Sequence, residues 1–471
     1  MKSRSMKNHL ITLLLFVVTT SICIAQSNGN HSDTLFIQAK EWSKDEAKQV
    51  HYSDWITYPS VTIDQLKGFK KNESIELDQF GGTGEVIDKT GFFHTKKMGN
   101  RWYVINPNGR KTYITAVNSI RTSNASPLPS KFKDESDWAE TTFRQLLNLN
   151  INTAGCWSDV DAILSYNKNN DKHPIAYTIQ LNLLSKYASE TKKKNPERKG
   201  TSTLGFILDD GFVDYCKNAS SVLLSTKNDP NLLGIFSDNE LPFTSGELKE
   251  LLSKKNEDDP CYMSYKSFMK DHSVDDQNIS KDQQKEFLAF LAGKYYAIVY
   301  QAIKSADPNH MYIGSRIHSN AKNNNYLFKA AAHYIDIISI NYYGDWQPKR
   351  EYINNWAEWC DKPFFITEFY TKAEETGMSN MSGAGWIVKT QKDRAIHYQN
   401  FCIELLKSKN CVGWHWFKYQ DNDPNDTKAD DSNKDSNKGI VNINCDYYTD
   451  LVQKMKELNA NIYSLIKYFD R

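Results

Sequence analysis

The sequence predicts an α/β protein built on a (β/α)8 TIM barrel with a small N-terminal extension. Eight short apolar runs alternate with segments of helical periodicity, which is typical of βα units and a parallel sheet. Several of these runs are apolar on both faces, as strands of a parallel sheet covered by helices are. The 471 residues also suffice for a barrel, which typically takes about 250 to 400 residues, plus one modest extra element.

The first 25 residues have the pattern of a signal peptide. Lys2, Arg4 and Lys7 precede an apolar run over residues 10–18, and Ala25 supplies a small residue for cleavage. We therefore expect a secreted or periplasmic protein. No later stretch of the sequence approaches the roughly 20 apolar residues that a membrane span needs.

Residues 26–90 are polar and show no strong period. They predict an N-terminal extension that lies on the barrel and contains some strand. From Gly91 the pattern sharpens into two strands and two tight turns over residues 91–109. We therefore assign residues 91–471 to the catalytic barrel.

The predicted barrel strands share an apolar run that ends in polar residues. They cover residues 113–118, 152–156, 175–181, 232–236, 311–315, 335–340, 364–367 and 411–416. A helix-rich insertion follows the fourth strand, where apolar residues recur on one helical face. These residues are Leu288, Leu291, Tyr295, Val299 and Ala302.

The charge balance excludes some classes of partner. Lys and Arg total 58 against 57 Asp and Glu, so no strong field attracts nucleic acid or an anionic membrane. Aromatic residues make up 13% of the chain, and such rings pack against the apolar faces of sugars as well as in protein cores. A neutral polymer is therefore the partner that the composition suits best.

Cysteine spacing and short motifs point to no cofactor and no metal. The seven cysteines after residue 25 form neither CxxC pairs nor Cys/His zinc spacings, so we expect scattered buried thiols. No HExxH, phosphate-cradling glycine loop or Gly-x-Ser-x-Gly elbow occurs at a convincing position. Metalloprotease, nucleotide-binding and serine-esterase functions therefore lose support.

Two of the predicted strands lead into a glutamate. Glu240 follows the fourth strand and Glu368 ends the seventh. Parallel barrels carry their chemistry at the carboxyl ends of the strands, and cleavage of a glycosidic bond needs two carboxyl groups. One strand-end glutamate alone more often caps a helix or pairs with a surface base, but the two together favour a glycosidase.

Other candidate ligands of a substrate fall at predicted strand ends, where polar residues also simply hydrate a cleft. They are Asn118, Asn239, Arg316, His318, Asn341 and Tyr342. Trp157 and Trp416 are candidates for stacking floors or for core positions. Trp386 lies in a glycine-containing loop of about 15 or more residues, which favours a lid or subsite. His415 fits a hydrogen-bonded structural histidine. The Asp/Asn-rich residues 421–437 match no EF-hand spacing and predict a solvated loop.

Several of these motifs resemble a known group of enzymes. The placement of Asn239-Glu240 and Glu368 is similar to that in clan A glycoside hydrolases, which have a (β/α)8 barrel and a retaining mechanism. Residues 367–370, 383–386, 390–394 and 413–417, with the approach over 91–109, resemble β-agarases of the family 50 type and their uncharacterised bacterial relatives. The resemblance covers roughly residues 91 to 445. Those agarases usually carry a larger N-terminal sugar-binding domain than residues 26–90 allow.

The resemblance implies a role for each member of the pair. Glu240 matches the acid/base and Glu368 the nucleophile, while Asn239 would hydrogen-bond the sugar 2-hydroxyl. Glu368 must stay ionised, with donors such as Arg316 or a tyrosine after the sixth strand. Retention of configuration requires the two carboxyl groups to lie about 5 to 5.5 Å apart.

The glutamate pair predicts a glycoside hydrolase, and the resemblance implies a retaining one that cleaves β-galactosidic linkages in an agar-type or related galactan polysaccharide or oligosaccharide. An exo-acting β-glycosidase on another glycan is the alternative within the enzyme class. A non-catalytic glycan-binding barrel is the alternative outside it. Loss of either glutamate would be the signature of the binding protein, and both are present.

Overall fold

The computed structural model describes residues 34–45, 50–71, 75–122, 127–272, 279–424, 426 and 429–471. The predicted signal peptide, residues 1–25, lies outside the described residues. Within these ranges no helix combines the length and the hydrophobicity needed to cross a bilayer.

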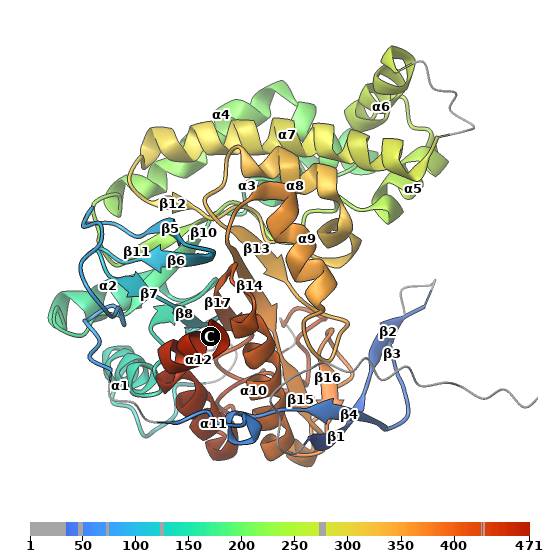
Figure 1. Ribbon diagram of the computed structural model, residues 1–471. Coiled ribbons are helices and arrows are strands. Elements are labelled where there is room, and N and C mark those ends of the chain that lie inside the picture. The colour runs from blue at the N-terminus through green and yellow to red at the C-terminus, as the bar shows by residue number, and fades with distance from the viewer. Residues whose placement is uncertain are drawn as a thin grey trace, which may run out of the picture.

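An eight-stranded parallel sheet forms the centre of the molecule (Figure 1). Its strands are β8 (Ile114–Val117), β9 (Thr153–Ala154), β10 (Ala176–Gln180), β11 (Leu232–Phe236), β12 (Met311–Tyr312), β13 (Ile338–Asn341), β14 (Phe364–Phe369) and β17 (Cys411–Trp416). Beyond the end of β12, Ile317 pairs in parallel with Ile340, and its backbone N–H donates to the Ser339 carbonyl at 2.8 Å. This bridge joins the two ends of the sheet, so the predicted TIM barrel is confirmed.

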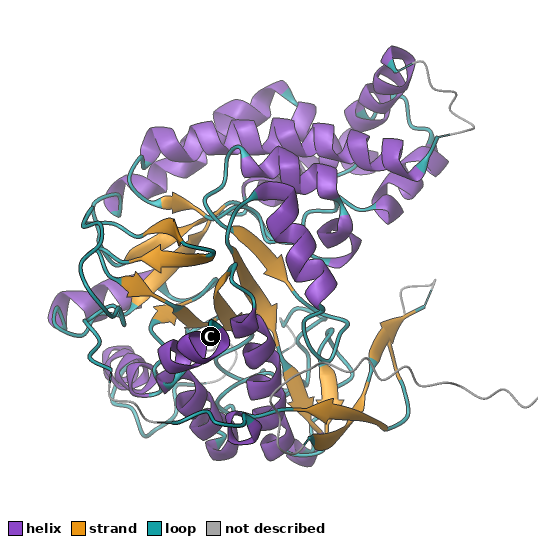
Figure 2. Ribbon diagram, in the orientation of Figure 1, coloured by secondary structure: helices purple, strands orange, loops and turns teal. Residues whose placement is uncertain are grey.

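Helices surround the strands on the outside (Figure 2). They are α1 (Glu135–Asn148), α2 (Val160–Asn169), α3 (Leu183–Lys194), α4 (Asp210–Ser220), α5 (Ser245–Lys254), α6 (Pro260–Asp271), α7 (Lys281–Ala306), α8 (Asn325–Ala332), α9 (Arg350–Cys360), α10 (Gln391–Lys407), α11 (Thr449–Ala460) and α12 (Ile462–Phe469). Short 3-10 turns are η1 (Ile63–Gln65), η2 (Pro196–Gly200), η3 (Leu204–Leu208), η4 (Ser221–Ser225), η5 (Ser319–Asn323) and η6 (Glu374–Thr376).

The predicted insertion after the fourth strand consists of α5, α6 and α7. Helix α7 begins with a capping box, in which Ser280 and Gln283 satisfy each other's backbone N–H groups. The five apolar residues predicted on one face of this helix are all buried. This periodic face therefore packs the insertion against the barrel.

The N-terminal residues add small sheets at the edge of the barrel. Strands β1 (Leu35–Lys40) and β4 (Ile56–Ser60) pair with each other, and β1 also pairs with β16 (Trp386–Val388), which pairs with β15 (Thr371–Ala373). A hairpin of β2 (Trp42–Lys44) and β3 (Val50–Tyr52) lies between β1 and β4 in the chain. The four-stranded sheet thus ties the first described residues to the loop after β14 (Figure 1).

A second small sheet closes the amino-terminal end of the barrel. It contains β5 (His94–Met98), β6 (Arg101–Ile105) and β7 (Lys111–Thr112). Phe80, Phe93 and Val104 belong to the same buried cluster as residues inside the barrel such as Phe236 and Phe365. Side chains therefore fill the barrel interior from below, as in other TIM barrels.

Candidate active site

A cavity of about 1290 Å³ opens at the carboxyl ends of the barrel strands. Its floor includes Trp157, Asn239, Glu240, Glu368 and Phe417, which follow or end strands β9, β11, β14 and β17. This is the end of a parallel barrel at which active sites occur. The cavity is therefore the candidate active site.

Left-handed backbone turns follow five consecutive barrel strands at this end. The non-glycine residues with positive φ are Ser119 (59°), Trp157 (59°), Asn182 (59°), Glu240 (52°) and Ser319 (51°), after β8, β9, β10, β11 and β12 respectively. All of them except Asn182 line the cavity. Such conformations cost energy for side chains with a Cβ and concentrate at functional sites, so the rim combines strain with a concave surface.

Glu368 lies buried on β14 and both of its carboxylate oxygens accept hydrogen bonds. Arg316 Nη1 donates to Oε1 at 2.7 Å, and the Tyr343 hydroxyl donates to Oε2 at 2.6 Å. Burial raises the pKa of Glu368, Arg316 opposes that shift, and the charge of Glu240 adds to it. The pKa of Glu368 is raised on balance, and the two donors limit that rise by stabilising the ionised carboxylate.

Arg316 is fully buried beneath the cavity. The carbon of its guanidinium lies 4.0 Å from the ring centroid of Trp157, and the Trp157 ring in turn packs edge-on against Phe417. Nε and Nη2 of Arg316 have no hydrogen-bond partner among the described residues. Glu368 and the rings of Trp157 and Phe236 thus hold this cation in place.

Glu240 is half-buried and is linked to Asn239 through Asn341. The side-chain amide of Asn341 donates to Glu240 Oε1 at 2.8 Å and to Asn239 Oδ1 at 3.0 Å. Its oxygen accepts from the Thr367 hydroxyl at 2.9 Å. Because Thr367 directly precedes Glu368, a single asparagine connects the strand ends that carry the two glutamates.

The turn that presents Asn239 and Glu240 is fixed from below by Asp238. This buried carboxylate accepts from the backbone N–H groups of Leu184 and Ser185 at 2.9 and 3.0 Å, and from the Tyr295 hydroxyl at 2.8 Å. Burial raises its pKa. The amino terminus of α3 and the long helix α7 therefore both position the end of β11.

His318 lines the cavity beside Glu240. Its Nδ1 has no partner within the described part of the chain. Burial lowers the pKa of His318, and the negative charge of Glu240 counteracts that shift. A neutral imidazole of this kind can donate a hydrogen bond to a hydroxyl group of a ligand or accept one from it.

The structure gathers eight of the residues predicted from the sequence around this cavity. Trp157, Asn239, Glu240, His318 and Glu368 line it. Asn118, Arg316 and Asn341 are buried beneath it. Asn118 donates to the Thr367 carbonyl at 2.8 Å, while its side-chain oxygen lies 3.3 Å from His415 Nδ1. Asn118, Arg316 and Asn341 are therefore placed to orient the side chains that line the cavity.

The other three predicted ligands point away from the cavity, which corrects the expectation for each. The Tyr342 hydroxyl donates to Asp345 at 2.8 Å, outside the barrel. Trp416 is buried and donates to the Lys438 carbonyl at 3.0 Å. Trp386 belongs to the four-stranded N-terminal sheet, where it packs against Tyr58 with ring centroids 4.8 Å apart. It is a core residue of that sheet and not part of a lid.

The loop over residues 421–437, predicted to be solvated, is exposed at Asp430, Asp431, Ser432 and Lys434 but buried at both of its ends. Asp421 is buried and accepts from Asn437, from the Gly439 backbone N–H and from the Tyr448 hydroxyl. Residues 429–435 line the same cavity as the two glutamates. The loop therefore forms one wall of the candidate site.

Some residues of the site escaped the sequence analysis. Tyr343 binds Glu368, yet the sequence favoured its neighbour Tyr342. Trp42 and Lys44 of the N-terminal hairpin also line the cavity, as does the buried Lys438. Two adjacent tyrosines after β13 were a usable signal, but nothing local in the sequence connects Trp42 with a site formed about 200 residues later.

Within the described ranges, no group of three or more His, Cys, Asp or Glu side chains is arranged to hold a metal ion.

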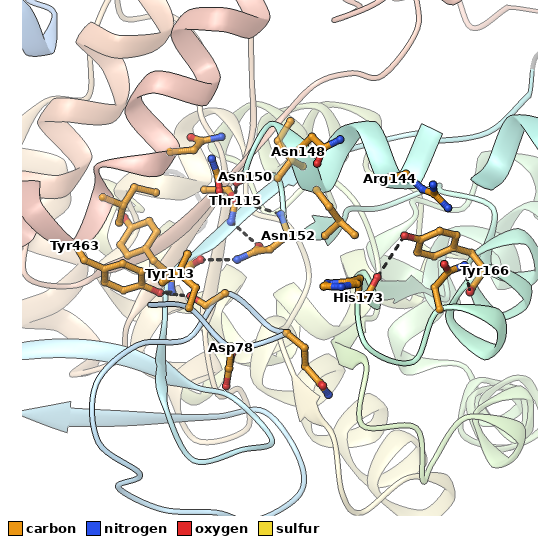
Figure 3. Close-up of a pocket in the computed structure, with 18 residues that line it drawn as sticks. Asp78, Tyr113, Thr115, Arg144, Asn148, Asn150, Asn152, Tyr166, His173 and Tyr463 are labelled. Carbon is orange, nitrogen blue, oxygen red and sulfur yellow. Dashed lines mark hydrogen bonds between the residues drawn. The ribbon is translucent and has the colours of Figure 1, made fainter. Parts of the chain in front are cut away.

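A second cavity, of about 590 Å³, lies at the opposite end of the barrel, and Figure 3 shows the residues that line it. Tyr113 and Asn152, which precede β8 and β9, line it together with Tyr463 of α12. Their polar atoms already serve the protein, because Asn152 donates to the Tyr113 carbonyl and Tyr463 to the Gly81 carbonyl. Polar residues at this end of a barrel usually serve stability, so this cavity is not the candidate site.

Comparison with known proteins agrees with this geometry. No protein-family profile matches the chain. Beta-agarase B of Vibrio sp. (strain JT0107) is 24% identical over 503 residues, which cover 82% of this chain and 50% of the agarase. The chain therefore spans half the length of that relative.

Solved structures extend the similarity. The crystal structure of BpGH50 superposes with a TM-score of 0.83 at 29% identity, covering 94% of this chain and 98% of that one. The structure of an exo-beta-agarase superposes with a TM-score of 0.66 at 19% identity, covering 84% and 68%, and shows a shared fold. The chain is thus similar to family 50 glycoside hydrolases and β-agarases and shares their TIM-barrel fold.

Proposed function

We propose that this enzyme is a retaining hydrolase of β-galactosidic linkages in an agar-type or related galactan, with Glu368 as nucleophile and Glu240 as acid/base. The assignment rests on two carboxyl groups that line one cavity and differ in their burial and in their hydrogen-bond donors. Glu368 is buried and receives two strong donors, whereas Glu240 is half-buried and receives one amide donor. Different surroundings for two carboxyl groups are what a division between nucleophile and acid requires.

The geometry supports two steps. In the first, a Glu368 oxygen forms a bond to the anomeric carbon while the bond to the leaving oxygen breaks and Glu240 gives its proton to that oxygen. In the second, Glu240 takes a proton from water, the water oxygen bonds to the anomeric carbon, and Glu368 is released. Arg316 and Tyr343 stabilise the carboxylate whenever it is free.

The first test is the release of reducing ends from agarose, porphyran, a β-galactan and a β-glucan. We expect Glu368→Ala to lower kcat by roughly 10⁴-fold or more, because the reaction loses its covalent step. Glu240→Gln should lose similar activity except on substrates with good leaving groups, which need no proton. Glu351→Ala, at an exposed position of α9, is the matched control and should behave as wild type.

Each outcome of this test decides one part of the proposal. Cleavage of agarose that disappears in Glu368→Ala supports both the substrate and the nucleophile. Cleavage of another glycan that disappears in Glu368→Ala supports the proposed mechanism but replaces the proposed substrate class. If the wild type and Glu368→Ala bind glycans equally and neither releases reducing ends, the chain is a glycan-binding barrel. Proton NMR of the first product should show the β-anomer, since retention preserves configuration.

We also propose that the enzyme is secreted or periplasmic. The basic start, the apolar run over residues 10–18 and Ala25 support this proposal. Mass spectrometry of the exported protein should give a mature chain that begins at Gln26. An uncleaved amino terminus would contradict it.

A further inference from the structure

The N-terminal hairpin reaches the candidate active site. Trp42 and Lys44 of β2 and Val50 of β3 line the cavity together with Glu240 and Glu368. In the chain these strands precede the barrel, and Figure 1 shows them projecting beyond the sheet of β1 and β4. The wall on this side of the cavity therefore comes from outside the barrel.

A buried lysine of β15 fixes the hairpin to the loop after β14. Lys372 Nζ donates to the Tyr52 hydroxyl, to the Asn380 carbonyl at 2.7 Å and to the Ser382 carbonyl at 2.9 Å. The Tyr52 hydroxyl donates in turn to the Gly383 carbonyl at 3.1 Å. Since Tyr52 pairs directly with Trp42 in the hairpin, these bonds hold Trp42 at a defined position over the cavity.

The accessible atoms of the Trp42 side chain are carbon atoms. Its Nε1 is shielded from solvent and has no partner within the described residues, whereas the residue as a whole is half-exposed. Lys44 Nζ lies 5.6 Å from the centroid of the Trp42 ring. Lys44 is also close enough to His318 to lower the pKa of that imidazole, after the larger effect of burial. The hairpin therefore stands on the side of the cavity that holds His318 and Glu240.

We propose that Trp42 is a sugar-binding residue, so that the hairpin of β2 and β3 forms one wall of a substrate subsite. An aromatic carbon surface beside polar groups suits the C–H face of a neutral hexopyranose ring. Hydroxyls of the same ring can then reach His318 or Lys44. This inference rests on the proposed function and extends it, because it assigns the N-terminal segment to substrate recognition as well as to bracing the barrel.

Steady-state kinetics on galactan oligosaccharides test this role. Trp42→Ala should raise KM by about tenfold and leave kcat within about twofold, because it removes binding energy that substrate and transition state share. Trp42→Phe should recover most of the loss, since a ring remains. Trp55→Ala is the matched control, because Trp55 lies in the same N-terminal segment under Lys40 and Lys389, outside the cavity lining.

A binding measurement separates this inference from the proposed function. In the Glu368→Ala background, titration with an agar-derived oligosaccharide should give a Kd about tenfold weaker when Trp42→Ala is added. An unchanged KM and Kd in Trp42→Ala, with cleavage by the wild type intact, overturns the role of Trp42 alone. An equal loss in Trp55→Ala also overturns it, because both changes would then act through the sheet. Failure of the wild type to bind or cleave any galactan overturns both proposals.

Discussion

Arg316 connects the proposed nucleophile to the aromatic floor of the cavity. It is fully buried, donates to Glu368 at 2.7 Å and lies over Trp157 at 4.0 Å. His415, packed nearby, stays neutral because burial and the positive charge of Arg316 lower its pKa to about 3. Burial works to lower the pKa of Arg316, but Cys156, Glu368 and Glu240 nearby raise it.

Replacement of Arg316 should therefore move the acid limb of the activity profile. In Arg316→Gln the pKa of Glu368, already raised by burial, loses the opposition of the guanidinium and rises further. The nucleophile must be deprotonated, so the acid limb of kcat/KM should shift to higher pH, and this profile reports the free enzyme. Arg144→Gln on the exposed face of α1 is the control. An unshifted limb in Arg316→Gln would show that Glu368 does not govern it.

Elements predicted from the sequence were most accurate where one local pattern decided the structure. Strand β11 has the bounds that its uninterrupted apolar run predicts, residues 232–236, and β14 starts where predicted, at residue 364. Strands β9 and β12 are shorter than expected, at two residues each. Gly314, at φ +78°, interrupts the second of them. An apolar run in the sequence predicts burial of a segment more reliably than it predicts the residue at which the hydrogen-bonded strand ends.

The misplaced tyrosine has a local physical cause. Asn341 and Tyr343 face the cavity, and Tyr342 between them points outward to Asp345. This is the alternation of an ordinary strand, and the register shift between Ile340 and Asn341 leaves it unchanged. Asn341 and Tyr342, both predicted from the sequence as ligands, are adjacent, so only one of them can face the cavity.

Other errors arose from pairing over long distances in the chain. Trp386 is core because β16 pairs with β1, where Ile387 lies opposite Lys40. The wall over residues 429–435 depends on contacts between the loops after β14 and β17. No local pattern in the sequence contains either pairing, so the glutamate pair could be predicted but the walls of the site could not.

Asn437 is the residue through which the loop after β17 is attached. Its side chain donates to Asp421 and accepts from the Ala373 backbone N–H at 3.1 Å and from Gln391 at 2.9 Å. Its own backbone N–H donates to Asn380 Oδ1 at 2.7 Å. The wall of the cavity thus depends on one buried amide that contacts β15 and α10.

Asn437→Ala should loosen this wall without touching the two glutamates. Loss of several buried hydrogen bonds costs about 1–3 kcal/mol for each group left unsatisfied. We therefore expect faster limited proteolysis within residues 421–438 and a KM raised by about fivefold or more. Asn444→Ala, at an exposed turn, should change neither. Equal proteolysis rates in the two variants would contradict the attachment.

On the scale of the whole molecule, the N-terminal sheet and the barrel share a hydrophobic contact around His397. This imidazole of α10 is buried against Trp346, with ring centroids 4.7 Å apart, and near Phe369 and Phe401. Trp346 also packs against Trp386 of the N-terminal sheet. Burial lowers the pKa of His397 to about 3, a backbone hydrogen bond to Trp346 opposes that shift, and the charge of Arg394 adds to it.

Buried neutral histidines make the stability of the fold depend on pH. Between about pH 3 and about pH 6.5 the unfolded chain binds a proton at position 397 that the folded chain does not bind. Stability therefore rises with pH through this window and is lost as the pH falls through it, by up to a few kcal/mol for a shift of this size. His415, with a pKa of about 3, contributes in the same direction.

His397→Gln removes this titration, so its urea unfolding midpoint should fall less between pH 7 and pH 4 than that of the wild type. The absolute midpoint at pH 7 also drops, because glutamine fills the aromatic pocket poorly, so the difference between the two pH values is the informative quantity. His333→Gln, on the exposed end of α8, should leave that difference unchanged. An identical pH dependence in wild type and His397→Gln would show that protonation of His397 does not contribute to the loss of stability in acid. A reduced dependence would show that proton uptake at this contact between the N-terminal sheet and the barrel is part of that loss.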